Sequence, residues 1–224
     1  TAILLEDFRI GVGDGNLRDA IAQAFTVDPS LVEYANQVRN DMGEVSVLAL
    51  SGEEALRSVR LVPFHPVRMM LARQGTISGV LGEGVRVAVE YKYDGARFQF
   101  HKQNGTCRMY SRRLEEVTSA MPDVVALLEG ALPDDVIVDG EVIAVQDGRP
   151  MPFQMVLRRF RRKHNVAQAA DAITMVPNLF DILYYNQEML IDRPFIERRE
   201  ILTKVSSRYV TPQLVSGKEE EIED

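Results

Sequence analysis

The spacing of apolar residues changes near Pro63, and no other feature of the sequence restricts the fold as much. Ahead of this proline, apolar residues recur every three or four positions, as over 31–38, which predicts amphipathic helices. Beyond it, apolar and other residues alternate, as over 85–90, which predicts strands. We therefore expect an all-helical segment over 1–62 and a second, strand-rich domain over 63–224.

Local signals position the helices of the first segment. The pair Asp28-Pro29 predicts a helix start, because the carboxylate can cap free backbone N–H groups and proline already has a helical φ. Ser51 with Glu54 has the form of a capping box and predicts another start. Gly43 predicts a break between helices.

The second segment has the pattern of an antiparallel sheet with helices between its strands. Asn104-Gly105 and Asp147-Gly148 predict tight hairpin turns, since such turns need positive φ at both central positions. Strands are expected over 98–101, 107–110, 136–145 and 178–185, and helices over 115–128, 152–163 and 196–205. This order predicts an α+β domain built on antiparallel sheet.

Composition and charge exclude several classes of protein. The chain has 224 residues, of which 46% are hydrophobic, so it can bury a sizeable core without metals or disulfides. No apolar run approaches the roughly 20 residues of a membrane span, and we expect no membrane partner. The net charge of −7 argues against indiscriminate binding to nucleic acid. A basic run can still contact phosphates locally, and it comprises Arg158, Arg159, Arg161, Arg162 and Lys163.

Lys92 lies between two expected strands, in the charged segment Glu90-Tyr91-Lys92-Tyr93-Asp94-Gly95-Ala96-Arg97. A lone lysine in a hairpin is usually an ordinary surface residue. Here both flanking strands hold the lysine in place, and Asp94-Gly95 permits a tight turn beside it. An amine among cations and partly withdrawn from water is favoured in its neutral, nucleophilic form. These features alone leave open whether Lys92 is a surface lysine or a nucleophile.

The segment around Lys92 resembles the first motif of ATP-dependent DNA ligases of the archaeal and eukaryotic type. Further segments resemble later motifs of that family in the same order, over 110–115, 138–142, 152–154 and 180–184. The resemblance implies an antiparallel nucleotidyltransferase (adenylation) domain over 63–224. It also implies that 1–62 is the helical C-terminal part of a DNA-binding domain.

The resemblance implies a role for each candidate residue. Lys92 would attack the α-phosphate of ATP and carry AMP covalently. The rest of the nucleotide site would be Glu90 at the adenine amino group, Arg97 and Arg112 at ribose and phosphate oxygens, Glu141 at the ribose hydroxyl or, through water, at Mg²⁺ or Mn²⁺, and Phe180 stacked on adenine. Arg112 would also meet the 5′-phosphate of a nick, and the basic run over 158–163 would face the DNA backbone.

The function implied is the sealing of nicks in duplex DNA by a monomer, with ATP and Mg²⁺ as cofactors and with a sliding clamp as a further partner. It would work in the cytoplasm (nucleoid) of an archaeon or in a eukaryotic nucleus. The family has a later glutamate motif, a lysine pair and an OB-fold, and none of them is found before Asp224. We therefore expect the chain by itself to be inactive or only partly active.

Two other functions remain open at the level of sequence. An RNA ligase or an mRNA-capping guanylyltransferase would use the same lysine chemistry, although the helical segment ahead of Pro63 argues against both. A non-catalytic nucleic-acid-binding module would keep the fold without the reaction. Such a module would have little reason to keep Lys92, Arg97 and Glu141 together.

Overall fold

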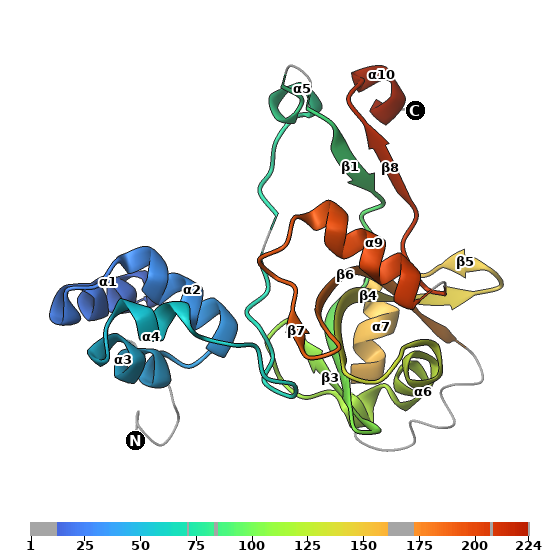
Figure 1. The fold of residues 1–224 in the computed structure, drawn as a ribbon. Helices are drawn as coiled ribbons and strands as arrows, with labels where there is room; N and C mark the ends of the chain where they lie inside the picture. The colour runs from blue at the N-terminus through green and yellow to red at the C-terminus, as the bar shows by residue number, and fades with distance from the viewer. Residues whose placement is uncertain (1–12, 71, 83–84, 161–172, 207, 224) are drawn as a thin grey trace. The chain divides into compact units, whose positions relative to one another are not determined.

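The computed structural model describes residues 13–70, 72–82, 85–160, 173–206 and 208–223. It forms two compact units, Thr1–Met69 and Met70–Asp224 (Figure 1). This division falls later than the boundary that we predict before Pro63. The reason is local, because the Arg68 N–H donates to the Gln37 carbonyl at 3.0 Å and ties the connecting segment to the first unit. No described helix is long and apolar enough to cross a membrane.

The first unit is helical throughout its described part. Its helices are α1 (Asp14–Phe25), α2 (Pro29–Arg39), α3 (Met42–Leu50) and α4 (Glu53–Arg57). Asp28 caps α2 as predicted, since its carboxylate accepts from the Ser30 N–H at 2.7 Å. The side chains of Val32, Ala35, Val45 and Leu56 are fully buried and form the centre of this unit.

Two expectations for the first unit are wrong. Gly43 does not break a helix: it lies inside α3, which Asp41 caps by accepting from the Glu44 N–H. Ser51 does not open a capping box, because Gly52, with a φ of 97°, precedes α4. The Ser51 hydroxyl instead donates to a carbonyl at the end of α3.

The second unit contains a six-stranded antiparallel sheet. Its strands are β2 (Ala96–Gln103), β3 (Thr106–Ser111), β4 (Val136–Gln146), β5 (Arg149–Pro150), β6 (Thr174–Tyr185) and β7 (Glu188–Met189). They follow the order β3-β2-β4-β6-β7, with β5 paired to β4. A separate antiparallel pair consists of β1 (Val87–Glu90) and β8 (Gln213–Ser216), and the short helices α5 (Ile77–Val80) and α10 (Glu219–Glu223) lie at its far end (Figure 1). The predicted α+β class is confirmed.

Both predicted hairpin turns are confirmed. Asn104 and Gly105 have φ values of 51° and 69°, and Asp147 and Gly148 have values of 50° and 74°. Positive φ at both central positions matches the right-handed twist of the strands that each turn joins. These turns position β2 against β3 and β4 against β5.

Three helices pack on one face of the large sheet. They are α6 (Pro122–Ala131), α7 (Phe153–Phe160) and α9 (Phe195–Val205). Their apolar side chains meet Phe98 and Val138 in a single core. Because successive side chains of a strand point to opposite faces, Arg97, Asp139 and Glu141 lie on the other face of the sheet. The candidate site is on that face.

The helix predicted over 115–128 is wrong in its first half, because α6 begins only at Pro122. The chain before it follows β3, where Glu116 bridges to Tyr110 and the Val117 N–H donates to the Met109 carbonyl at 2.8 Å. Only the short 3₁₀ turn η1 (Thr118–Ala120) interrupts this path. Pairing with a strand therefore overrides the helical spacing of the apolar residues.

Candidate active site

Lys92 is exposed and lies in the loop between β1 and β2, which is held at three places. Ahead of Lys92, Glu90 ends β1 and pairs with Gln213 of β8. Behind it, one carboxylate oxygen of Asp94 accepts from the N–H of Phe153, the first residue of α7, at 3.2 Å. The loop then enters β2, so the amine sits on a short segment between fixed strands.

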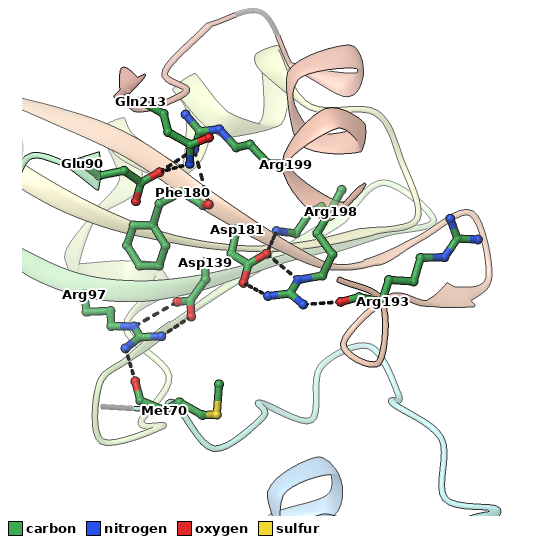
Figure 2. Close-up of polar contacts among 11 residues, drawn as sticks. Met70, Glu90, Arg97, Asp139, Phe180, Asp181, Arg193, Arg198, Arg199 and Gln213 are labelled. Atoms are coloured by element: carbon green, nitrogen blue, oxygen red, sulfur yellow. Dashed lines mark hydrogen bonds and ion pairs between the residues drawn. The ribbon is translucent and has the colours of Figure 1, made fainter. Parts of the chain in front are cut away.

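Arg97 presents a fixed cation on the open face of the sheet (Figure 2). Its Nη2 atom lies 2.6 Å from Oδ2 of Asp139, and its Nη1 atom donates to the Met70 carbonyl at 2.7 Å. Asp139 is only 3% exposed. Burial raises the pKa of the Asp139 carboxyl to about 6, and the guanidinium opposes that rise. Arg97 therefore offsets the charge of a buried carboxylate on this face of the sheet.

Glu141 interacts with most of the charged groups of the site. It stands opposite Arg97 in the register of β2 with β4, so both side chains lie on one face. Burial raises the pKa of Glu141 to about 7, while the charges of Arg97 and Lys92 oppose the rise and those of Asp139 and Asp94 add to it. The charge of Lys92 thus acts on Glu141, and strand register sets Glu141 opposite Arg97.

The raised pKa of Glu141 predicts a pH-dependent stability. An acid whose pKa is higher in the folded than in the unfolded protein stabilises the fold at low pH, and this contribution is lost as pH rises. For Glu141 the loss falls between about pH 4.5 and 7. Glu141→Gln should therefore raise the melting temperature relative to the native chain more at pH 8 than at pH 4. Thermal unfolding at both values measures this, with Glu200→Gln, which removes an exposed carboxylate, as control. An equal difference in melting temperature at both pH values would contradict the burial of the Glu141 carboxyl.

Phe180 and Glu90 complete the group. Phe180 lies on β6, and the Arg97 guanidinium carbon is 5.4 Å from the centre of its ring, within the range of a cation–π contact (Figure 2). Glu90 accepts one hydrogen bond from Gln213 and forms an ion pair with Arg199. Burial raises the pKa of Glu90, and Arg199 opposes the rise. One half-buried ring and one anchored carboxylate therefore flank the open face beside Lys92.

Arg112 lies in the exposed turn after β3. Because Ser111 pairs with Phe98 at the start of β2, this turn is at the same end of the sheet as Arg97. No hydrogen bond or ion pair joins Arg112 to another described residue, so its guanidinium is available to a ligand. Its role at a phosphate stays a prediction.

Only part of the predicted basic run can be placed. Arg158 is exposed on α7, a helix that buries Val156 in the core. For Arg159 only the backbone is described, within α7. Arg161, Arg162 and Lys163 lie outside the described residues. The proposed contact of this run with DNA therefore stays a prediction.

The sequence did not indicate Asp181, Arg198 and Arg199 as site residues. Arg198 holds Asp181 through two nitrogens, at 2.8 Å each, next to Phe180 (Figure 2). Arg199 is 8% exposed and contacts Glu90. One sequence feature could have indicated Arg199, because it stands three residues before Leu202, which is buried on the same helix. An arginine at a core-facing position of a helix needs a partner.

Among the described residues, no group of three or more metal-binding side chains exists. Glu141 still offers one half-buried carboxylate beside Lys92. Mg²⁺ commonly binds one or two carboxylates together with phosphates of the substrate and water. The residues present therefore fit a divalent cation that arrives with a nucleotide.

The fold and the site define the class of the second unit: it is an adenylation domain of the nucleotidyltransferase kind. The family model described as ATP dependent DNA ligase domain matches residues 69–221. This chain belongs to that family, as the sequence motifs predict.

The curated relatives are archaeal DNA ligases. The DNA ligase of Methanospirillum hungatei is 87% identical over 223 residues, which are 100% of this chain and 41% of the relative. The DNA ligase of Methanocorpusculum labreanum is 54% identical, across 99% of this chain and 40% of the relative. The chain thus spans about two fifths of the length of these relatives.

Two solved structures share the fold. A mycobacterial DNA ligase D complexed with ATP and MES is 27% identical, with a TM-score of 0.50, and the match covers 64% of this chain and 45% of that one. The ligase domain of LigD from M. tuberculosis is 26% identical, with a TM-score of 0.51 over 64% of this chain and 44% of that one. The predicted antiparallel nucleotidyltransferase fold is confirmed.

Proposed function

We propose that the protein containing this chain is an ATP-dependent DNA ligase that seals nicks in duplex DNA. The observation that carries the proposal is that Lys92 lies in a loop held between two strands, which leads into the strand where Arg97 stands opposite Glu141, and that its charge acts on Glu141. A lysine amine in this setting can attack a phosphorus atom that neighbouring groups orient. Membership of the ligase family supports the same reaction.

The proposed reaction has three transfers. The Lys92 nitrogen forms a bond to the α-phosphorus of ATP, and pyrophosphate leaves. The 5′-phosphate at the nick then takes AMP from Lys92, which restores the amine. Finally, the 3′-hydroxyl attacks the adenylated phosphate, joins the strand and releases AMP. Each step needs positioning and charge stabilisation more than covalent chemistry from further side chains.

The remaining residues of the site have proposed roles in holding ATP. Arg97 and Arg112 would donate to ribose and phosphate oxygens, for which a guanidinium suits because its charge and planar donors are permanent. Phe180 would stack on the adenine, and Glu90 would accept from its amino group. Mg²⁺ or Mn²⁺, when bound, would neutralise charge on the phosphates, and Glu141 would hold it through water or contact the ribose.

The proposed partner is nicked duplex DNA. Arg112 would meet its 5′-phosphate, and the basic run that begins at Arg158 would contact the backbone. The helical first unit would be the end of a DNA-binding domain over 1–62, ahead of an adenylation domain over 63–224. We further propose a monomer that a sliding clamp recruits, in the cytoplasm (nucleoid) of an archaeon, because the curated relatives are archaeal.

Nick sealing by the full-length protein tests the function. With ATP and Mg²⁺, a nicked duplex carrying a 5′-phosphate and a 3′-hydroxyl should be joined, and a nick without the phosphate should not. A nick that lacks the 3′-hydroxyl should accumulate 5′-adenylated DNA, because the last transfer is blocked. Transfer of GMP to RNA ends in place of DNA joining would favour the capping alternative, and joining restricted to RNA would favour an RNA ligase. A protein that binds nicked DNA and performs none of these transfers would be a non-catalytic module.

A further inference from the structure

Arg199 connects three segments of the candidate site. It lies on α9 and is 8% exposed. Its Nη1 atom is 3.2 Å from Oε1 of Glu90 and 3.4 Å from the Phe180 carbonyl oxygen (Figure 2). Its Nη2 atom donates to the carbonyl of Thr211, in the segment that leads into β8. One guanidinium therefore holds the end of β1, the middle of β6 and the approach to β8.

Gln213 holds the same oxygen of Glu90 from a second side. Its Nε2 atom donates to Oε1 at 3.0 Å, and the two residues face each other in the register of β1 with β8 (Figure 2). No described residue donates a hydrogen bond to the other oxygen, Oε2. The hydrogen bond from Gln213 and the ion pair with Arg199 meet at one oxygen and restrict the rotation of the carboxylate, so Oε2 has a set direction and a free lone pair.

We propose that Arg199 and Gln213 are positioning residues that set the choice of nucleobase, by fixing Glu90 so that its Oε2 atom accepts from the 6-amino group of adenine. This inference rests on the proposed function. A fixed carboxylate oxygen favours an amino group over a carbonyl at the same position, because two acceptors facing each other leave both unpaired and repel. Hypoxanthine, with a 6-carbonyl in place of the amino group, is the base that this arrangement rejects.

The charge around Glu90 gives the arrangement a second signature. Burial raises the pKa of Glu90 and the negative charge of Asp181 adds to the rise, while Arg199 and the hydrogen bond from Gln213 oppose it. Loss of the hydrogen bond from Gln213, or a weaker ion pair at position 199, therefore favours the protonated carboxyl, which can donate to a carbonyl. Base selectivity should then decline further as pH falls, a response that a purely structural role of the two residues would not produce.

The test compares ATP with inosine triphosphate in the full-length protein, with formation of the covalent nucleotide adduct as readout. Gln213→Leu removes one donor and leaves Arg199 in place. Arg199→Lys keeps the charge but loses the planar fork that reaches two carbonyls and Glu90 together. Arg193→Lys is the matched control, since Arg193 forms an exposed ion pair with Glu188.

We expect the ratio of kcat/KM for ATP to that for inosine triphosphate to fall about five- to tenfold in Gln213→Leu and at least as much in Arg199→Lys. The fall should come mainly from a higher KM for ATP and should increase as pH is lowered. The Arg193→Lys control should keep the ratio of the native protein. Thermal unfolding identifies any loss of fold in Arg199→Lys, in which case Gln213→Leu decides.

An unchanged ratio in a folded Gln213→Leu protein would overturn the inference and leave the proposed function intact. An equal loss of activity with both nucleotides would also overturn it, because that result indicates a structural role alone. A native protein that forms no covalent adduct with ATP would instead overturn the proposed function, and the inference with it.

Discussion

Replacement of Lys92 by alanine should reduce covalent transfer of AMP from ATP to the full-length protein by at least about a thousandfold. The amine is the atom that forms the bond to phosphorus in the proposed reaction, and no other described lysine lies on the loop between β1 and β2. Lys92→Arg should be equally inactive, because a guanidinium keeps its charge but does not give up a proton. Incubation with ATP labelled at the α-phosphate, followed by denaturing electrophoresis, measures the adduct.

The control for Lys92 is Lys204→Ala, which removes an exposed lysine from α9 in the same unit. It should form the adduct at the native rate. Sealing of a nick that already carries a 5′-adenylate should survive in Lys92→Ala far better than sealing from ATP, since the last transfer does not need the amine as nucleophile. A native level of adduct in Lys92→Ala would contradict the assignment of the nucleophile.

Gly95→Ala should destabilise the protein and slow adenylation, because no side chain fits at this position. A Cβ atom on Gly95 would lie 2.3 Å from the Val142 carbonyl oxygen and 2.9 Å from Cγ of Glu141. The first contact is with the backbone of a central strand, so the loop that carries Lys92 must move instead. Overpacking of this kind costs about 1–3 kcal/mol of stability. A shift of the amine by about an ångström lowers the rate of transfer about a hundredfold.

Gly130→Ala provides the matched comparison for Gly95. Gly130 lies near the end of α6, and a Cβ atom there would meet nothing within 4 Å. The alanine should leave adenylation unchanged and raise stability by up to about 1 kcal/mol, because alanine favours helix. Melting temperature and adduct formation measured on both variants separate the two cases. Equal behaviour of the two alanine variants would mean that the close approach of Gly95 to β4 has no consequence.

The parts of the fold that depend on neighbours in sequence were predictable. The turn at Asn104-Gly105 follows from two adjacent residues that tolerate positive φ, and the cap at Asp28 follows from the next residues along the chain. The segment over 115–121 was not predictable in this way. Its path depends on pairing with β3. The spacing of its apolar residues fits a helix and fits this paired path equally well, so the spacing does not distinguish them.

The candidate site also contains a part that sequence neighbours determine and a part that distant contacts determine. The motif around Lys92 is continuous in sequence, so the candidate nucleophile and the turn at Asp94-Gly95 could be predicted directly. The partners that hold the site are distant: Arg97 and Asp139 are 42 positions apart, and Glu90 and Gln213 are 123 apart. Such pairs arise from strand register and helix packing, which a single sequence does not specify. For Arg199 the sequence contains one indication, which is a charged residue at a core-facing position of α9.

The location of AMP on the full-length protein tests the account most directly. After reaction with ATP, the protein is digested and its peptides are sequenced by mass spectrometry. We expect AMP on a single lysine, Lys92, and its loss when pyrophosphate or nicked DNA is added. AMP on a different residue, or complete reaction without any covalent nucleotide, would contradict the role assigned to the loop between β1 and β2.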